Sequence, residues 1–123
     1  MSPHDVIELA ERGKMAGCSE ALITLGELPE VHVMAKANLE ALGFNSTVDY
    51  LVELCRSVLD KGLLPHINTG VLESSELSSL HRYSASMGLM LEDAAELQAH
   101  AKSPGKSPEL RTRTIEAAGE LTI

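Results

Sequence analysis

Short apolar runs alternate along this chain with longer segments in which apolar residues recur at helical spacing. A short apolar run bounded by turn residues is typical of a strand buried on both faces. Strands that alternate with helices indicate parallel βαβ units with the helices outside the sheet. The pattern therefore predicts an α/β fold with about four parallel strands, the last only beginning. The predicted strands are Ala21–Leu25, Leu63–Ile67, Ser84–Leu91 and Leu121–Ile123.

Helical periodicity accounts for most of the remaining chain. Ser46 and Asp49 match a capping box ahead of an apolar stripe that continues to Gly62. Ser107 and Pro108 are suited to the cap and first position of another helix, after a loop rich in Ser, Pro and Gly. The predicted helices are Pro3–Ala16, Pro29–Leu42, Ser46–Gly62, Glu73–His81, Asp93–Ala101 and Pro108–Ala118.

Length limits the architecture. A chain of 123 residues is enough for one domain with one core, so residues 1–123 are expected to form part of a single domain. A closed barrel of alternating strands and helices needs eight strands. The chain therefore matches either part of such a barrel or a small open sheet.

Composition excludes several classes of partner. The hydrophobic content of 44% is that of a folded protein, and aromatic residues make up only 2%. A net charge of −8 argues against a nucleic acid or an anionic membrane as partner, since both need a basic surface. No apolar run approaches the roughly 20 residues of a membrane span, and the first residues do not resemble a signal peptide.

Cys18 and Cys55 are the two cysteines, and their spacing matches neither a metal motif nor a redox CxxC motif. Both are expected to be buried, reduced thiols rather than ligands, and no metal site is predicted. Unpaired cysteines favour a reducing compartment, so a cytoplasmic protein is expected.

Several short motifs, in order, resemble the FO synthase family, which closes the deazaflavin ring of 7,8-didemethyl-8-hydroxy-5-deazariboflavin (FO). The resemblance extends from Pro3 to the last residue. Its most specific parts are Gly17–Leu22, Thr24–Glu27, Asp49–Leu51, Leu63–His66, Ser84–Glu92 and Ser107–Arg111.

This resemblance implies a segment of a radical S-adenosylmethionine (SAM) lyase with a (β/α) barrel. The whole enzyme would use SAM and a 4Fe–4S cluster on a small-molecule substrate, the hydroxybenzyl adduct of ribityl-aminouracil, with release of ammonia. A second FO synthase subunit or half would be its possible protein partner. Family members hold the cluster with a CxxxCxxC triad, which this chain lacks. The segment alone is therefore expected to be inactive.

The resemblance also implies residues that bind SAM. Gly26 and Glu27 stand where radical SAM enzymes place a GGE-like motif that receives the ammonium of SAM, although Leu25 replaces its first glycine. Ser86 and Glu92 belong to the strand segment that contacts ribose or methionine in relatives. Arg111 occupies a helix start where related enzymes bind the SAM carboxylate, which a guanidinium can grip bidentately. Without the resemblance, a strand-ending turn and solvated side chains explain these residues equally well.

His66 and Asn68 end the strand Leu63–Ile67 and are the candidates for substrate binding. A histidine at a strand end is as often structural. His100 and Lys106 flank the Ser-Pro-Gly loop and are expected near the mouth of the site. The other histidines are expected on the surface.

Two alternatives remain open. The chain could be a truncated, non-catalytic α/β relative or an interaction module, which the missing cluster ligands favour. An ordinary nucleotide-binding domain is disfavoured because the chain contains neither GxGxxG nor GxxxxGK[ST].

Overall fold

The computed structural model describes residues 1–26 and 28–123, apart from the side chain of Pro104. Within them, the strands β1 (Glu20–Thr24), β2 (Leu64–Asn68) and β3 (Ser86–Met87) form one parallel sheet of three, in the order β1-β2-β3. The helices are α1 (Pro3–Met15), α2 (Val33–Ala41), α3 (Thr47–Asp60), α4 (Ser74–His81) and α5 (Pro108–Glu120). The predicted parallel α/β fold is confirmed, with a sheet of three described strands instead of about four.

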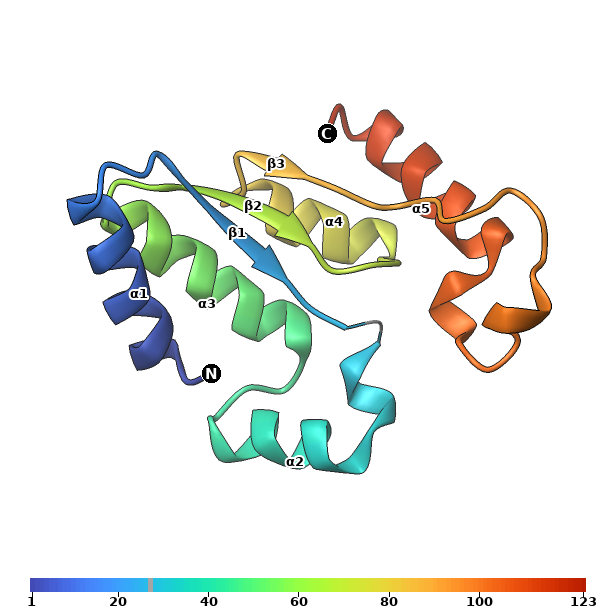
Figure 1. The fold of residues 1–123 in the computed structure, drawn as a ribbon, viewed down its shortest axis with the longest axis horizontal. Coiled ribbons are helices and arrows are strands. Elements are labelled where there is room, and N and C mark those ends of the chain that lie inside the picture. The colour runs from blue at the N-terminus through green and yellow to red at the C-terminus, as the bar shows by residue number, and fades with distance from the viewer. Residues whose placement is uncertain (27) are drawn as a thin grey trace.

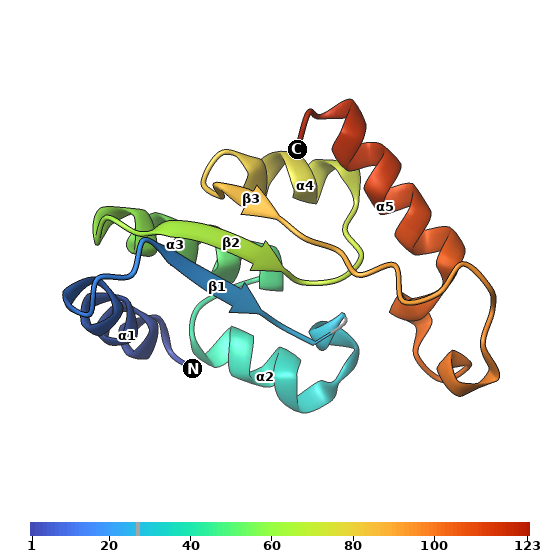
Figure 2. The same ribbon diagram turned by 45° about the horizontal axis from the view of Figure 1, so that its top comes forward.

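Helices cover one face of this sheet. In Figures 1 and 2, α1, α3 and α4 lie on the same side of the sheet, α2 lies beyond the carboxyl end of β1, and α5 continues past α4. Ile67 of β2 is fully buried against Leu51 and Cys55 of α3 and Leu80 of α4. A second cluster joins α1 to α3 through Ala10, Val58 and Leu63. The core thus lies between the sheet and the outer helices.

The opposite face carries no helix in the described part of the chain, and we call it the bare face. Side chains alternate between the two faces of a strand. The side chain of Leu22 therefore lies on the face opposite to that of Ile23, and Leu22 is 67% exposed. Leu64 is 49% exposed on the same side. The strand residues of the bare face are Glu20, Leu22, Thr24, Leu64, His66, Asn68 and Ser86.

Caps fix where the principal helices begin. Ser2 and Asp5 form a capping box at α1. At α3, the Ser46 side chain accepts a hydrogen bond from the Asp49 backbone nitrogen, but the reciprocal bond of the predicted capping box, from the Ser46 nitrogen to Asp49, is not found among the described residues. Glu30, carried by the short 3-10 helix η1 (Pro29–Val31), accepts from another free backbone donor, the Thr47 nitrogen, at 2.5 Å. A distant carboxylate thus completes the cap of α3.

Two predicted strands are shorter in the structure or absent from it. The expected strand Ser84–Leu91 is reduced to Ser86–Met87, which pair with His66 and Ile67 of β2. The expected strand Leu121–Ile123 is a turn, in which the Ile123 nitrogen bonds to the Ala118 carbonyl at 3.0 Å. Three residues without a neighbouring strand have no ladder to join, so they close the end of α5 instead.

Two predicted helical features also differ. The segment Asp93–Ala101 forms only the 3-10 helix η2 (Gln98–His100), and the Asp93 side chain bonds to the Ala95 nitrogen. Such local side-chain bonds compete with helix formation. The predicted helix Pro29–Leu42 is divided into η1 and α2, and α2 has no buried residue; its Met34 is 75% exposed. None of the described helices has both the length and the apolar character needed to cross a membrane.

Candidate functional site

The carboxyl ends of the described strands meet at one edge of the sheet. The Leu25 nitrogen donates to the Asn68 carbonyl at 3.2 Å, which places Gly26 next to the end of β2. On the other side of β2, the Gly88 nitrogen donates to the Ile67 carbonyl at 2.8 Å. The structure therefore brings the candidates Gly26 and Asn68 together. Glu27, the other half of the predicted SAM motif, lies outside the described residues.

His66 and Ser86 form a hydrogen-bonded pair on the bare face. They are register partners in β2 and β3, and His66 Nδ1 is 2.6 Å from Ser86 Oγ. Leu22 of β1 occupies the same row on the other side of His66. Sequence reasoning assigned Ser86 to SAM and His66 to the substrate. It missed the hydrogen bond between them, because that bond depends on the register of β2 and β3.

Gly88 lies beside the second nitrogen of His66. A Cβ atom built on Gly88 would be 3.2 Å from Nε2 and 3.6 Å from Cε1, closer to the nitrogen than packed side chains usually come. The glycine therefore leaves room at the edge of the imidazole. Glycine commonly serves this purpose where a ligand or backbone approaches closely.

The turn after β2 contains a buried hydroxyl. Thr69 is 7% exposed, and its Oγ1 has no hydrogen-bond partner among the described residues. Thr69 and Gly70 border a largely apolar hollow of about 310 Å³ between β2, β3 and α5. Gly70 has φ +82°, a left-handed conformation that glycine adopts without strain. The backbone conformation of the turn thus favours glycine at position 70. The buried Thr69 hydroxyl has no hydrogen-bond partner among the described residues.

Glu92 stands beyond β3 in a loop with left-handed backbone, at φ +70°. Its carboxylate is 3.4 Å from the Lys106 ammonium, and both side chains are about one third exposed. Lys106 belongs to the short 3-10 helix η3 (Pro104–Lys106) just before α5. The ion pair joins the two ends of the loop between β3 and α5.

Arg111 strengthens the same connection from inside the protein. It is 3% exposed, and its Nε donates to the Gly105 carbonyl at 2.9 Å. Its Nη1 donates to the Met90 carbonyl. Arg111 is therefore a buried residue bonded to backbone on both sides of the loop, rather than an extended surface side chain. The structure brings Arg111 and Glu92 to the same loop.

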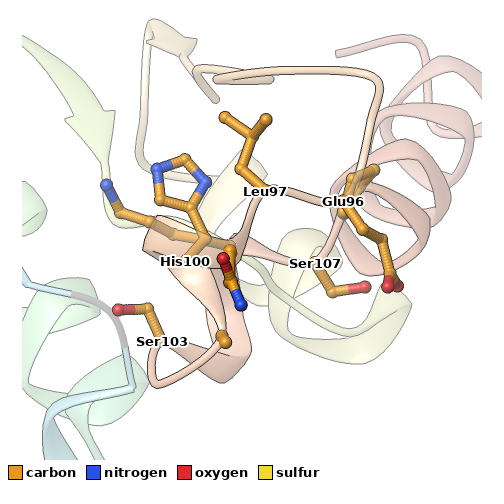
Figure 3. Close-up of a pocket in the computed structure, with 9 residues that line it drawn as sticks. Glu96, Leu97, His100, Ser103 and Ser107 are labelled. Atoms are coloured by element: carbon orange, nitrogen blue, oxygen red, sulfur yellow. The ribbon is translucent and has the colours of Figure 1, made fainter.

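An open hollow of about 510 Å³ lies along this loop (Figure 3). His100 and Lys106 both border it. Figure 3 shows the hydroxyl groups of Ser103 and Ser107 pointing in opposite directions, and Glu96 extending away from His100. The Ser103, Ser107 and Glu96 side chains therefore do not converge on one ligand atom.

The described residues do not fit a 4Fe–4S cluster. Cys55 is buried in the core, where desolvation raises the pKa of its thiol to about 11, and the deprotonated thiolate is the form that binds iron. Cys18 follows α1 and is exposed, so the expectation that both thiols are buried holds for Cys55 and is wrong for Cys18. No group of three His, Cys, Asp or Glu side chains within the described chain could hold a metal ion.

The carboxyl edge of the sheet combines open backbone with side chains that can accept hydrogen bonds. The backbone at Gly26 is open toward the described residues, because a Cβ atom placed there would have none of their atoms within 4 Å. A ligand could therefore approach it closely. Asn68 and Glu92 add acceptor oxygens for ammonium and hydroxyl groups. Fold and site together define a parallel α/β protein with polar groups gathered at the carboxyl ends of its strands, which is where such folds bind ligands.

Comparison with curated proteins names the relatives. The whole chain is 50% identical over 123 residues to the 7,8-didemethyl-8-hydroxy-5-deazariboflavin synthase of Methanosarcina mazei. It is 46% identical over 124 residues to the synthase of the same name from Archaeoglobus fulgidus. The resemblance to FO synthases is confirmed, and the chain is homologous to a segment of these enzymes.

The chain covers 37% of the Methanosarcina mazei synthase and 38% of the Archaeoglobus fulgidus synthase. It thus spans well under half the length of these relatives. No protein-family model and no solved structure matches the chain.

Proposed function

We propose that this chain is the part of a radical SAM FO synthase that carries SAM-binding and substrate-binding groups of a (β/α) barrel. The parent enzyme would be a lyase that forms FO with release of ammonia, methionine and 5′-deoxyadenosine. Thiolate ligands for the 4Fe–4S cluster would have to come from outside the 123 residues. The segment alone would then be inactive, in keeping with its poor match to a cluster.

The observation that carries the proposal is the bare face of the sheet. An open, doubly wound sheet is covered by helices on both faces, whereas a barrel has helices only outside and encloses the other face. Here the helices lie on one side, and the bare face carries His66, Asn68 and Ser86. Partly exposed Leu22 and Leu64 on that face suit an interior that further strands would enclose.

Within this proposal, Gly26, Glu27, Glu92 and Arg111 belong to the SAM side of the site. Because Arg111 bonds to two loop carbonyls, it would act on SAM chiefly by holding the segment that carries Glu92. His66 and Asn68 would face the pyrimidine or ribityl part of the substrate. When bound and cleaved, SAM supplies the radical, and these residues position the reactants and exclude water.

A segment exchange tests the proposal. The matching segment of the Methanosarcina mazei synthase would be replaced by this chain, and FO would be measured by fluorescence after anaerobic cluster assembly. We expect FO together with 5′-deoxyadenosine. A folded chimera with a full cluster that makes neither product would contradict the proposal.

Asn68→Ala and Glu116→Gln in that chimera separate site effects from general ones. Asn68 ends β2 at the carboxyl edge, whereas Glu116 is exposed on α5. We expect the first variant to lower FO formation at least tenfold and the second to leave it unchanged. A non-catalytic relative would give no product in any of these proteins.

A further inference from the structure

The hydrogen bond between His66 and Ser86 occupies Nδ1 of the imidazole and leaves Nε2 for a ligand. His66 lies in the middle of β2, flanked by Leu22 in β1 and Ser86 in β3. Its two strand neighbours, Pro65 and Ile67, are buried on the helix-covered face, so the imidazole lies on the bare face. Both His66 and Ser86 are half-buried, which limits how freely their side chains can move.

The hydroxyl of Ser86 restricts the tautomer of His66. Oγ is 2.6 Å from Nδ1, and no other hydrogen bond of this hydroxyl is found within the described residues. If Ser86 donates its proton to Nδ1, its one O–H is satisfied by the protein. If it accepts from Nδ1, its proton needs another acceptor, which the described residues do not provide. The first arrangement is favoured, and it puts the imidazole proton on Nε2.

Gly88 determines the surroundings of that second nitrogen. Because a Cβ atom on Gly88 would be only 3.2 Å from Nε2, the glycine leaves open a flank that any other residue would crowd. Gly88 also anchors the end of β3 through its bond to the Ile67 carbonyl. The imidazole is thus held at Nδ1 and left accessible near Nε2.

We infer that Ser86 is a positioning residue, which holds His66 as the tautomer protonated on Nε2 so that this N–H donates to an acceptor oxygen of the ligand on the bare face. The inference rests on the proposed function for the identity of the ligand, whose pyrimidinedione carbonyls would be suitable acceptors. On this inference, Ser86 does not contact SAM directly, as the resemblance implied, but acts through His66.

Nuclear magnetic resonance of the ¹⁵N-histidine-labelled chain tests the tautomer without any activity. Protonated and unprotonated ring nitrogens have widely separated ¹⁵N shifts, and the spectrum would be recorded at about pH 8.5, where imidazoles are neutral. His66→Gln identifies the His66 signals among the five histidines. We expect one tautomer, protonated on Nε2, in the unaltered chain and in Ser86→Thr, and a mixture in Ser86→Ala. A proton on Nδ1, or identical spectra for the unaltered chain and Ser86→Ala, overturns the inference.

The chimeric synthase tests the consequence. Ser86→Ala and His66→Gln should each lower the rate of FO formation at least tenfold, and Ser86→Thr should restore most of the loss caused by Ser86→Ala. The double variant that combines Ser86→Ala with His66→Gln should be no slower than His66→Gln alone, because Ser86 acts through His66. An active chimera that is insensitive to Ser86→Ala overturns the positioning role. An inactive chimera before any substitution contradicts the proposed function instead, and the spectra still decide the tautomer.

Discussion

The Nε atom of Arg111 donates to the carbonyl oxygen of Gly105 at 2.9 Å, inside the protein. The same guanidinium donates to Met90, so one side chain at the start of α5 holds both ends of the loop that follows β3. Planar guanidinium groups are suited to two acceptors at once, which an ammonium on a flexible stem cannot reproduce. This loop carries Glu92, so its stability bears on the proposed SAM site.

Arg111→Ala is expected to lower the free energy of unfolding by about 2–4 kcal/mol, because it removes a buried guanidinium and leaves the carbonyl of buried Gly105 without its donor. Arg111→Lys should recover only part of this loss. Urea denaturation followed by circular dichroism gives the measurement. Arg113→Ala, at an exposed position of the same helix, serves as control and should change the free energy by less than about 0.5 kcal/mol. A loss of equal size for both alanine variants would contradict the role of Arg111 in the loop.

The bare face of the sheet is expected to make the isolated chain self-associate. Leu22 and Leu64 expose apolar surface there, and the outer edges of the described sheet are unpaired. Leu22→Thr together with Leu64→Thr should shift the chain toward monomer in size-exclusion chromatography with light scattering. Met34→Thr removes a side chain of similar exposure on α2, away from the sheet, and should leave the distribution unchanged. A monodisperse monomer before substitution would count against the prediction.

The two cysteines are expected to react at very different rates. Cys55 is buried and its pKa is raised to about 11, so only about one thiol in a thousand is ionised at pH 8. Cys18 is exposed. A disulfide reagent at pH 8 should therefore modify one thiol quickly in the native chain and the second only after unfolding, as followed by mass spectrometry. Cys18→Ser should abolish the fast reaction, and fast labelling of this variant would contradict the buried position of Cys55.

The cap of α3 is expected to weaken in acid. Burial raises the pKa of Glu30, but hydrogen bonding, chiefly with Thr47, lowers it by more, so its pKa lies below the ordinary value of 4.5. A carboxyl group whose pKa is lowered by folding stabilises the protein above its unfolded pKa. That contribution is lost as the pH falls through the folded pKa. The stabilising effect of Glu30 should therefore be complete near neutral pH and decline below about pH 4.5.

Comparison with Glu30→Gln isolates this contribution, because the amide keeps an acceptor oxygen but does not titrate. The difference in unfolding free energy between the two proteins should be constant from about pH 7 to pH 5.5 and shrink toward pH 3. Asp5 also has a lowered pKa, through its hydrogen bonds with Ser2, and contributes equally to both proteins. Glu40→Gln, an exposed change on α2, should show no such difference.

Anaerobic iron and sulfide reconstitution of the chain alone is expected to yield no 4Fe–4S cluster. Its two cysteines cannot supply a CxxxCxxC triad, and one of them is buried with a raised pKa. Iron and sulfide analysis after gel filtration gives the measurement, and a FO synthase carrying the triad is the positive control. A stoichiometric cluster on the chain would contradict the prediction.

Local sequence patterns determined the α/β class, most helix positions and the direction of the strands. The stripe of α3 and the cap at Ser46 depend on residues a few positions apart, so they could be predicted without tertiary information. The same holds for β1 and β2, whose apolar runs differ by a residue or less at either end from the observed strands. The motifs that resemble FO synthases were likewise readable from sequence, and the comparisons confirmed them.

Tertiary structure decided how the candidate residues are used. Register between β2 and β3 paired His66 with Ser86, and folding of the loop onto α5 buried Arg111 against Met90 and Gly105. It also ended β3 after Met87 and placed Glu30 at the start of α3. These contacts join residues 17 to 21 positions apart, apart from the local bond to Gly105. Periodicity in sequence reports only which side of an element is apolar, whereas such partners depend on how the elements pack.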